Sequence, residues 1–116
     1  EEERLHEHAA LVGSTLKANL ASLAMRHDCI GDVRGRGLFL GIEFVKDRST
    51  KEPAPDIAAY VVNRAKELGV LLSVDGPSHN VIKIKPPMTF TAQNADRLVG
   101  TLDQVLTEDS VRALKG

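Results

Sequence analysis

Residues 30–45 read IGDVRGRGLFLGIEFV and indicate two extended segments joined by a bend. A short segment covers residues 30–33, glycines on both sides of Arg36 allow the bend, and an unbroken apolar-rich strand follows at residues 38–45. Side chains alternate along a strand, so every second residue lies on the same face. One face is entirely apolar and comprises Leu38, Leu40, Ile42 and Phe44; the other comprises Phe39, Gly41, Glu43 and Val45. We therefore predict a central strand with one face fully buried.

Three helices are expected around these strands. Apolar residues recur at helical spacing within residues 3–27, at Leu5, Ala9, Val12, Leu16, Leu20 and Leu23. A second helix is expected at residues 56–68, with Asp56 as its cap and Gly69 as its left-handed stop. Thr91 is expected to cap a third helix at residues 92–107.

Two further strands are expected at residues 70–74 and 81–85, because both are short apolar-rich runs bounded by turn residues or by Pro86 and Pro87. The turn-rich DGPSHN lies between them at residues 75–80, and residues 47–55 are expected to form an exposed loop. The connections within the strand pairs are too tight for parallel crossovers. We therefore predict an α+β fold, with helices packed on one face of a mainly antiparallel sheet of about three or four strands.

Length and composition favour one ordinary domain and exclude several classes of partner. The 116 residues are expected to form a single domain, with a connecting helix at residues 1–28, an α/β core at 30–108 and a tail at 109–116. A net charge of -1 with one Tyr, three Phe and no Trp argues against nucleic-acid binding. No apolar run approaches the roughly 20 residues that span a bilayer, so no membrane partner is expected. The acidic start at residues 1–3 does not resemble a targeting peptide, and the single cysteine suits a reducing compartment.

Lys83 and Lys85 are the candidate binding residues. Strand alternation places both on one side of residues 81–85, so two ammonium groups could meet an anionic ligand. The alternative is a solvated edge strand protected from aggregation by its lysines. No metal site is predicted, because His6 and His8 are two residues apart on a helix and point to different sides. The glycines of residues 33–41 lead into a strand, not into the helix N-terminus that a dinucleotide-binding loop requires.

A series of motifs over roughly residues 3–107 resembles the C-terminal part of the class III aminotransferases, which depend on pyridoxal 5'-phosphate (PLP). The motifs are IGDVRGRGLFLGIEFV at residues 30–45, ELGVLL at 67–72 and NVIKIKPPMTFT at 80–91. Within that family, LLSVDGPSHNVIKIKPPMTF at residues 71–90 looks most like the alanine-glyoxylate aminotransferase 2-like branch. That branch comprises phospho-lyases acting on ethanolamine phosphate and 5-phosphohydroxy-lysine. The resemblance implies the small domain of a fold-type I enzyme.

The resemblance also implies what this chain leaves to the rest of such an enzyme. In the family, the Schiff-base lysine and the other residues that hold pyridoxal 5'-phosphate lie upstream in a large domain. No catalytic or cofactor-binding residue is therefore expected here, and the chain alone is expected to be inactive. The implied partners are an amine or amino-acid substrate, a large PLP-binding domain of the same chain and a second copy in a homodimer. The expected compartment is the cytoplasm, or the mitochondrial matrix in a eukaryote.

One departure from the family concerns the substrate. Ordinary class III aminotransferases carry an arginine at the position matching Lys83, where it clamps the substrate carboxylate. Lysine lacks the planar fork needed for two parallel hydrogen bonds but can still meet a phosphate as a point charge. The resemblance thus favours either a transaminase or a phospho-lyase. The substrate would be an amine or amino acid, and for a phospho-lyase it would be phosphorylated. A stand-alone α+β ligand-binding module and a dimerisation module are the rival hypotheses.

Overall fold

The computed structural model describes residues 2–36, 39–85 and 90–115. The described elements follow in the order α1 (Glu2–Arg26), β1 (Ile30–Arg36), β2 (Phe39–Asp47), β3 (Glu52–Pro53), α2 (Pro55–Glu67), β4 (Ser73–Asp75), β5 (Val81–Ile84), α3 (Ala92–Thr107) and α4 (Asp109–Lys115). The expectations for Leu38, Pro86 and Pro87 lie outside the described residues.

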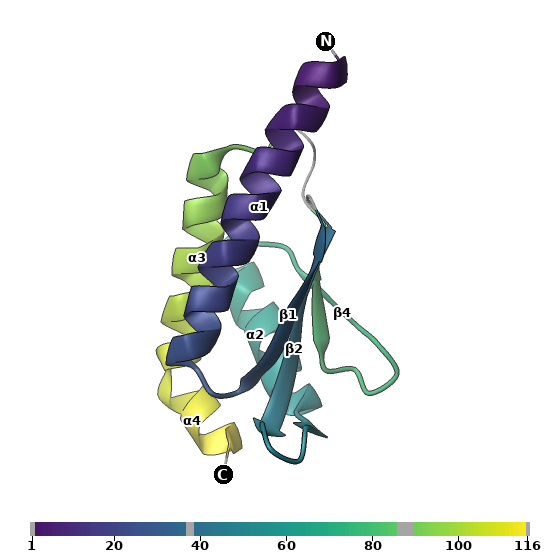
Figure 1. Cartoon of the computed structure of the whole chain (residues 1–116). Helices are drawn as coiled ribbons and strands as arrows, with labels where there is room; N and C mark the ends of the chain where they lie inside the picture. The colour runs from purple at the N-terminus through teal and green to yellow at the C-terminus, as the bar shows by residue number, and fades with distance from the viewer. Residues whose placement is uncertain (1, 37–38, 86–89, 116) are drawn as a thin grey trace.

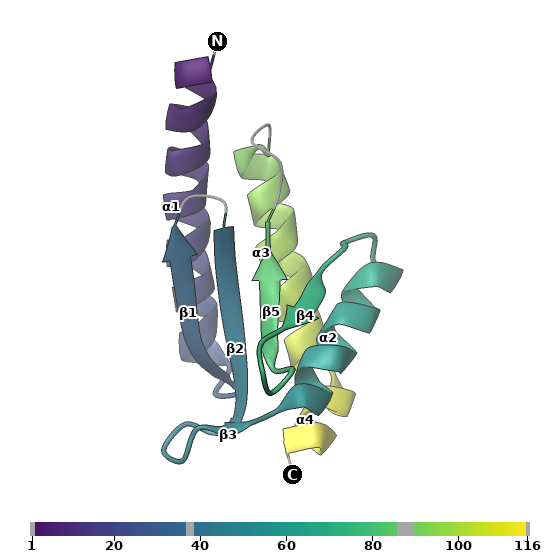
Figure 2. The ribbon, with the colours of Figure 1, turned by 90° about the vertical axis from the view of Figure 1, so that its right-hand side faces the viewer.

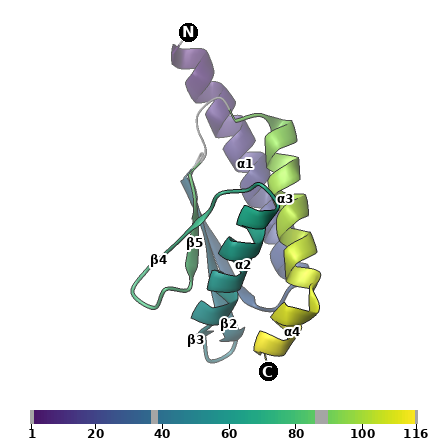
Figure 3. The same ribbon diagram turned by 180° about the vertical axis from the view of Figure 1, so that it is seen from behind.

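The sheet has the order β1-β2-β5-β4, with β3 added beside β2, and every described pairing is antiparallel. Helices α1, α2 and α3 all lie on one face of it, and α1 runs beside α3 (Figures 1 and 3). The predicted α+β fold class is therefore confirmed. The opposite face of the sheet carries no helix in the described part of the chain (Figure 2).

Strand β2 forms the centre of the core, as its alternation predicts. Leu40, Ile42 and Phe44 are buried under the helices, together with Leu16 and Leu20 of α1 and Leu102 of α3. Val45 lies on the other face but is also buried, because β1 covers it where the register shifts near Gly31. A Cβ atom on Gly31 would lie 2.8 Å from Val45 Cγ1, so only glycine permits this close approach.

The two later helices test the predicted caps. Asp56 as the cap of α2 was wrong: the N-cap is Ala54, no side chain caps it, and the helix begins at Pro55. Proline suits this first position because its fixed φ matches the helix and its missing N–H is not needed there. Thr91 does cap α3, in a reciprocal capping box with Asn94, and Gly69 ends α2 with a φ of +88°.

Several details differ from the predictions. Strand β1 continues to Arg36 instead of ending at residue 33, and β2 continues to Asp47 instead of ending at residue 45. The sheet has five described strands instead of three or four. Strand β4 covers Ser73–Asp75 instead of residues 70–74, because the Val70 amide hydrogen-bonds to Ala65 O at the end of α2 and keeps residues 70–72 out of the sheet. Residues 52–53 within the expected loop pair with β2 as β3. The expected tail contains the helix α4, held by the burial of Val111.

No helix in the described residues is both long and apolar enough to cross a bilayer.

Candidate functional site

The open face of the sheet brings together side chains from four strands. Lys83 of β5 lies in register between Gly41 of β2 and Ser73 of β4. Gly41 in turn pairs with Arg34 of β1, so these positions form one row across the sheet. Because Gly41 has no side chain, the sheet surface is recessed at β2. The long side chains of Arg34 on β1 and Lys83 on β5 stand on either side of this position.

The Lys83 ammonium has two neighbours on this face. It forms an ion pair with the Asp75 carboxylate at the end of β4, and it lies 5.8 Å from the centre of the Phe39 ring. The Lys85 ammonium lies 5.7 Å from the centre of the same ring. A cation at this distance from an aromatic face is attracted by the ring quadrupole. Phe39, which is 53% exposed, is therefore a common neighbour of both ammonium groups.

Asp75 is an exposed carboxylate whose charged form is further stabilised by its neighbours. The hydrogen bond from Lys83 lowers the pKa of the Asp75 carboxyl most strongly, and the Gly76 backbone amide and the Lys83 charge lower it further. Its side chain is 52% exposed and that of Lys83 is 45% exposed, so water reaches both partners.

A hollow of about 380 Å³ lies among these residues, lined by Arg34, Phe39, Gly41, Asp75, Val81 and Lys83. This volume falls within the range of small-molecule sites. Arg34 also has carboxylate neighbours, with its Nη1 atom 3.1 Å from Asp32 and 3.7 Å from Glu43. The hollow thus contains two cations, each already facing a carboxylate.

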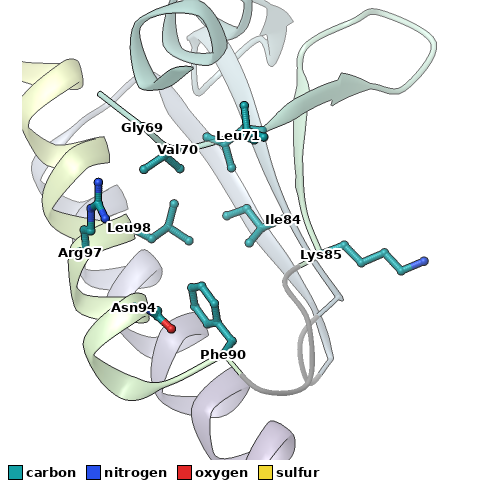
Figure 4. A pocket seen from close by; sticks show the side chains of 10 residues that line it. Gly69, Val70, Leu71, Ile84, Lys85, Phe90, Asn94, Arg97 and Leu98 are labelled. Carbon is teal, nitrogen blue, oxygen red and sulfur yellow. The ribbon is translucent and has the colours of Figure 1, made fainter. Parts of the chain in front are cut away.

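A second hollow, of about 320 Å³, lies on the helix side of β5. Figure 4 shows its largely apolar wall, formed by Val70, Leu71, Ile84, Phe90 and Leu98. The side chain of Lys85 points away from this hollow, towards the open face (Figure 4). Arg97 at its edge donates a hydrogen bond to Leu68 O over 3.4 Å. Nothing polar and buried points into this hollow from the lining residues that are described, so we place the candidate site on the open face.

The structure thus brings the two predicted lysines to one place, and it adds residues that the sequence did not single out. Phe39 and Arg34 share the period-two pattern of their strands, but their closeness to Lys83 depends on how β1, β2 and β5 pair. Asp75 was assigned to a loop and is instead the last residue of β4. His79, in the loop between β4 and β5, is exposed and has a φ of 53°. His8 of α1 forms a hydrogen bond of 2.8 Å between its Nε2 atom and the Phe90 backbone oxygen.

The described residues do not fit a covalently held PLP group. Such a site needs a lysine inside a cofactor pocket, with a partner for the pyridine nitrogen. Every lysine whose surroundings are described is exposed: Lys17, Lys46, Lys51, Lys66, Lys83 and Lys85. We therefore assign no step of cofactor chemistry to these residues. Among the described residues, no group of three or more His, Cys, Asp or Glu could hold a metal ion.

The architecture defines a small α+β domain with a two-sided sheet, one side packed and one side open. Residues 1–106 match the aminotransferase class-III family, and the chain belongs to that family. Its fold is that of the corresponding part of PLP-dependent transaminases of fold type I, among them an amine transaminase from an uncultivated Pseudomonas species described in its PLP-bound form, with 32% identity and a TM-score of 0.79. PLP is thus the cofactor of the proteins this chain resembles.

Three relatives show which branch it resembles. The chain is 48% identical over 107 residues to ethanolamine-phosphate phospho-lyase homolog 1 of Caenorhabditis elegans, covering 91% of this chain and 23% of the relative. It is 47% identical to the mitochondrial alanine–glyoxylate aminotransferase 2 homolog 2 of Arabidopsis thaliana, covering 93% and 23%. A phospholyase from Arthrobacter in complex with phosphoethanolamine superposes with a TM-score of 0.87 at 36% identity, covering 92% and 25%. The chain therefore spans about a quarter of the length of these relatives.

Proposed function

We propose that this chain is the C-terminal, substrate-side domain of a PLP-dependent transaminase or phospho-lyase, and that Lys83 binds the anionic group of a phosphorylated amine. The observation that carries the proposal is the position of Lys83. It lies on the open sheet face, at the edge of a hollow and beside an aromatic ring. The resemblance to class III aminotransferases implies that ordinary members of that family carry an arginine at this position.

On this proposal, the rest of the full-length protein holds the cofactor, and this chain contributes to substrate binding. PLP, when held by the rest of the full-length protein, supplies an electron sink. The described residues supply recognition: the lysines attract the anion, and the strands β2 and β5 hold those lysines in fixed positions. On this proposal the chain is inactive alone. Two subunits form the active enzyme, and its compartment is the cytoplasm, or the mitochondrial matrix in a eukaryote.

The type of cation supports phosphate over α-carboxylate. Arginine binds a carboxylate through two parallel hydrogen bonds, and lysine cannot reproduce this fork. An ammonium group binds a phosphate oxygen as a point charge from several directions. The similarity to the phospho-lyase homolog and to the Arthrobacter phospholyase supports the same substrate class.

Replacing Lys83 tests the proposal in the full-length protein. Lys83→Ala should lower kcat/KM for ethanolamine phosphate roughly tenfold to hundredfold, because a charge-assisted hydrogen bond contributes about 1.5 to 3 kcal/mol. Steady-state kinetics with ethanolamine phosphate and with alanine measure the effect side by side. Lys66→Ala is the matched control, since Lys66 is an exposed lysine on α2.

Two results would contradict the proposal. If Lys83→Ala leaves both substrates unchanged, Lys83 is a solvated strand residue that only protects the sheet from aggregation. If the reading frame begins with a methionine just before Glu1, the chain is a stand-alone ligand-binding or dimerisation module, and no large domain accompanies it.

A further inference from the structure

The Asp75–Lys83 ion pair raises a question that the proposed function leaves open. Lys83 can bind an incoming anion only with its ammonium group, and in the structure that group already faces the Asp75 carboxylate. Any anion that uses Lys83 must therefore displace Asp75 or bind beside it. The following inference rests on the proposed function and concerns this competition.

The pair is built across two strands. Val81 is the residue directly opposite Asp75, and Ser73 is directly opposite Lys83, so the two charged residues are diagonal neighbours on one face. Diagonal neighbours lie within reach of each other when one side chain is long. Asp75 ends β4, and the Gly76 amide contributes to the lowered pKa of its carboxyl. The carboxylate therefore lies at the strand end, and the lysine approaches it from within β5.

The pair is also exchangeable. Both side chains are about half exposed, so water and a competing anion can reach them. An exposed ion pair is weak, whereas a buried pair would lock the lysine in place. The Phe39 ring lies 5.8 Å from the Lys83 ammonium and gives that group a second favourable neighbour when the carboxylate is displaced.

Cations and carboxylates lie close together around the hollow. Arg34 faces Asp32 and Glu43, and Lys83 faces Asp75. Asp75 is the carboxylate that pairs with the lysine placed at the proposed anion site. Removing its charge would make the hollow more positive by one unit, which would retain a multiply charged anion more tightly.

We propose that Asp75 is a specificity-determining residue that acts as a displaceable counterion of Lys83. Asp75 forms an ion pair with Lys83 when the site is empty. The phosphate group of the substrate displaces it, and the ion pair forms again when inorganic phosphate leaves. Asp75 thereby weakens retention of the phosphate product and keeps Lys83 from binding anions that engage it poorly.

Inorganic phosphate is the probe that tests this role. In the full-length holoenzyme at about pH 8, where phosphate groups are largely dianionic, calorimetric titration measures its dissociation constant. Asp75→Asn should lower that constant roughly threefold to tenfold, because it removes the competing partner of an exposed ion pair. The inhibition constant of phosphate against ethanolamine phosphate should fall by the same factor.

Three matched variants make the result specific. Lys83→Ala should weaken phosphate binding, and the double variant Asp75→Asn/Lys83→Ala should bind phosphate no more tightly than Lys83→Ala alone. Asp96→Asn is the control for net charge, since Asp96 is exposed on α3, in the helix layer behind the sheet. It should leave phosphate affinity within about twofold of the unchanged enzyme.

The outcomes separate this inference from the proposed function. If Lys83→Ala weakens phosphate binding but Asp75→Asn leaves it unchanged or weakens it too, Asp75 is not a competitor and the inference is wrong, while the proposed function stands. If Lys83→Ala does not change phosphate affinity, the anion site is not at Lys83 and both fail. An equal gain in Asp96→Asn would assign the effect to net charge and overturn the inference as well.

Discussion

At the scale of single residues, the chemistry of this chain depends on which cation occupies position 83. Lysine and arginine carry the same charge, but only arginine presents two parallel donors to a carboxylate. The sequence identified this position, and the structure shows that the side chain there meets Asp75 and Phe39. On the proposed function, the choice of cation and the presence of its counterion together determine which anion binds at Lys83.

Exchanging the cation should change substrate preference. Lys83→Arg in the full-length protein should raise kcat/KM for amino acids with an α-carboxylate relative to ethanolamine phosphate, because it restores the planar fork. Competition between the two substrates in one reaction measures the ratio directly. Lys85→Ala should change that ratio less, since Lys85 lies two residues further along the chain. A larger effect from Lys85 than from Lys83 would reverse their assigned roles.

At the scale of elements, local signals explain which boundaries were predicted well. The bounds of α3 match the predicted residues 92–107. Thr91, which the sequence predicts as its cap, fixes the start of the helix, and the structure adds a reciprocal hydrogen bond from the Thr91 amide to the Asn94 side chain. Leu98 and Leu102 lie four residues apart, a spacing that predicts a shared apolar face of the helix, and both are buried. By contrast, β3 is a two-residue strand that pairs with the end of β2 across a short turn, and α4 packs against α2 and α3. Neither element carries a strong local pattern in the sequence.

The shared core of these elements can be tested at α3. Leu102 is fully buried among the helices and the sheet, so Leu102→Ala should lower the free energy of unfolding by roughly 2 to 5 kcal/mol. Urea denaturation followed by circular dichroism provides the measurement. Gln104→Ala on the exposed side of the same helix is the control and should change stability by less than about 0.5 kcal/mol. A loss below about 1 kcal/mol for Leu102→Ala would contradict the common core.

At the scale of the whole molecule, the open face of the sheet is the surface on which we expect another part of the full-length protein to pack. Helices cover one side of the sheet (Figure 2). The other side presents the charged residues Arg34, Asp75 and Lys83 around a hollow. This arrangement suits a domain that completes a site instead of containing one.

The isolated 116-residue chain should therefore fold without retaining PLP. After mixing with PLP and dialysis, absorbance spectroscopy should show no stoichiometric band from a covalent PLP–lysine adduct, because the described lysines are exposed. The full-length protein, treated identically, is the positive control. A dialysis-resistant band that maps to one lysine of this chain would contradict the assignment.

The sequence by itself determined the α+β class, the apolar face of β2, the bounds of α3 and the shared side of Lys83 and Lys85. These properties follow from period and capping, which act over a few residues and are therefore readable locally. Only the tertiary structure decided that Asp75 meets Lys83, that Phe39 lies beside both lysines, and that residues 109–115 form a helix against the core. Those contacts depend on the register between β2, β4 and β5 and on packing between distant segments. Strand pairing is fixed by the burial of a whole face and not by any one segment, so no local pattern could reveal them.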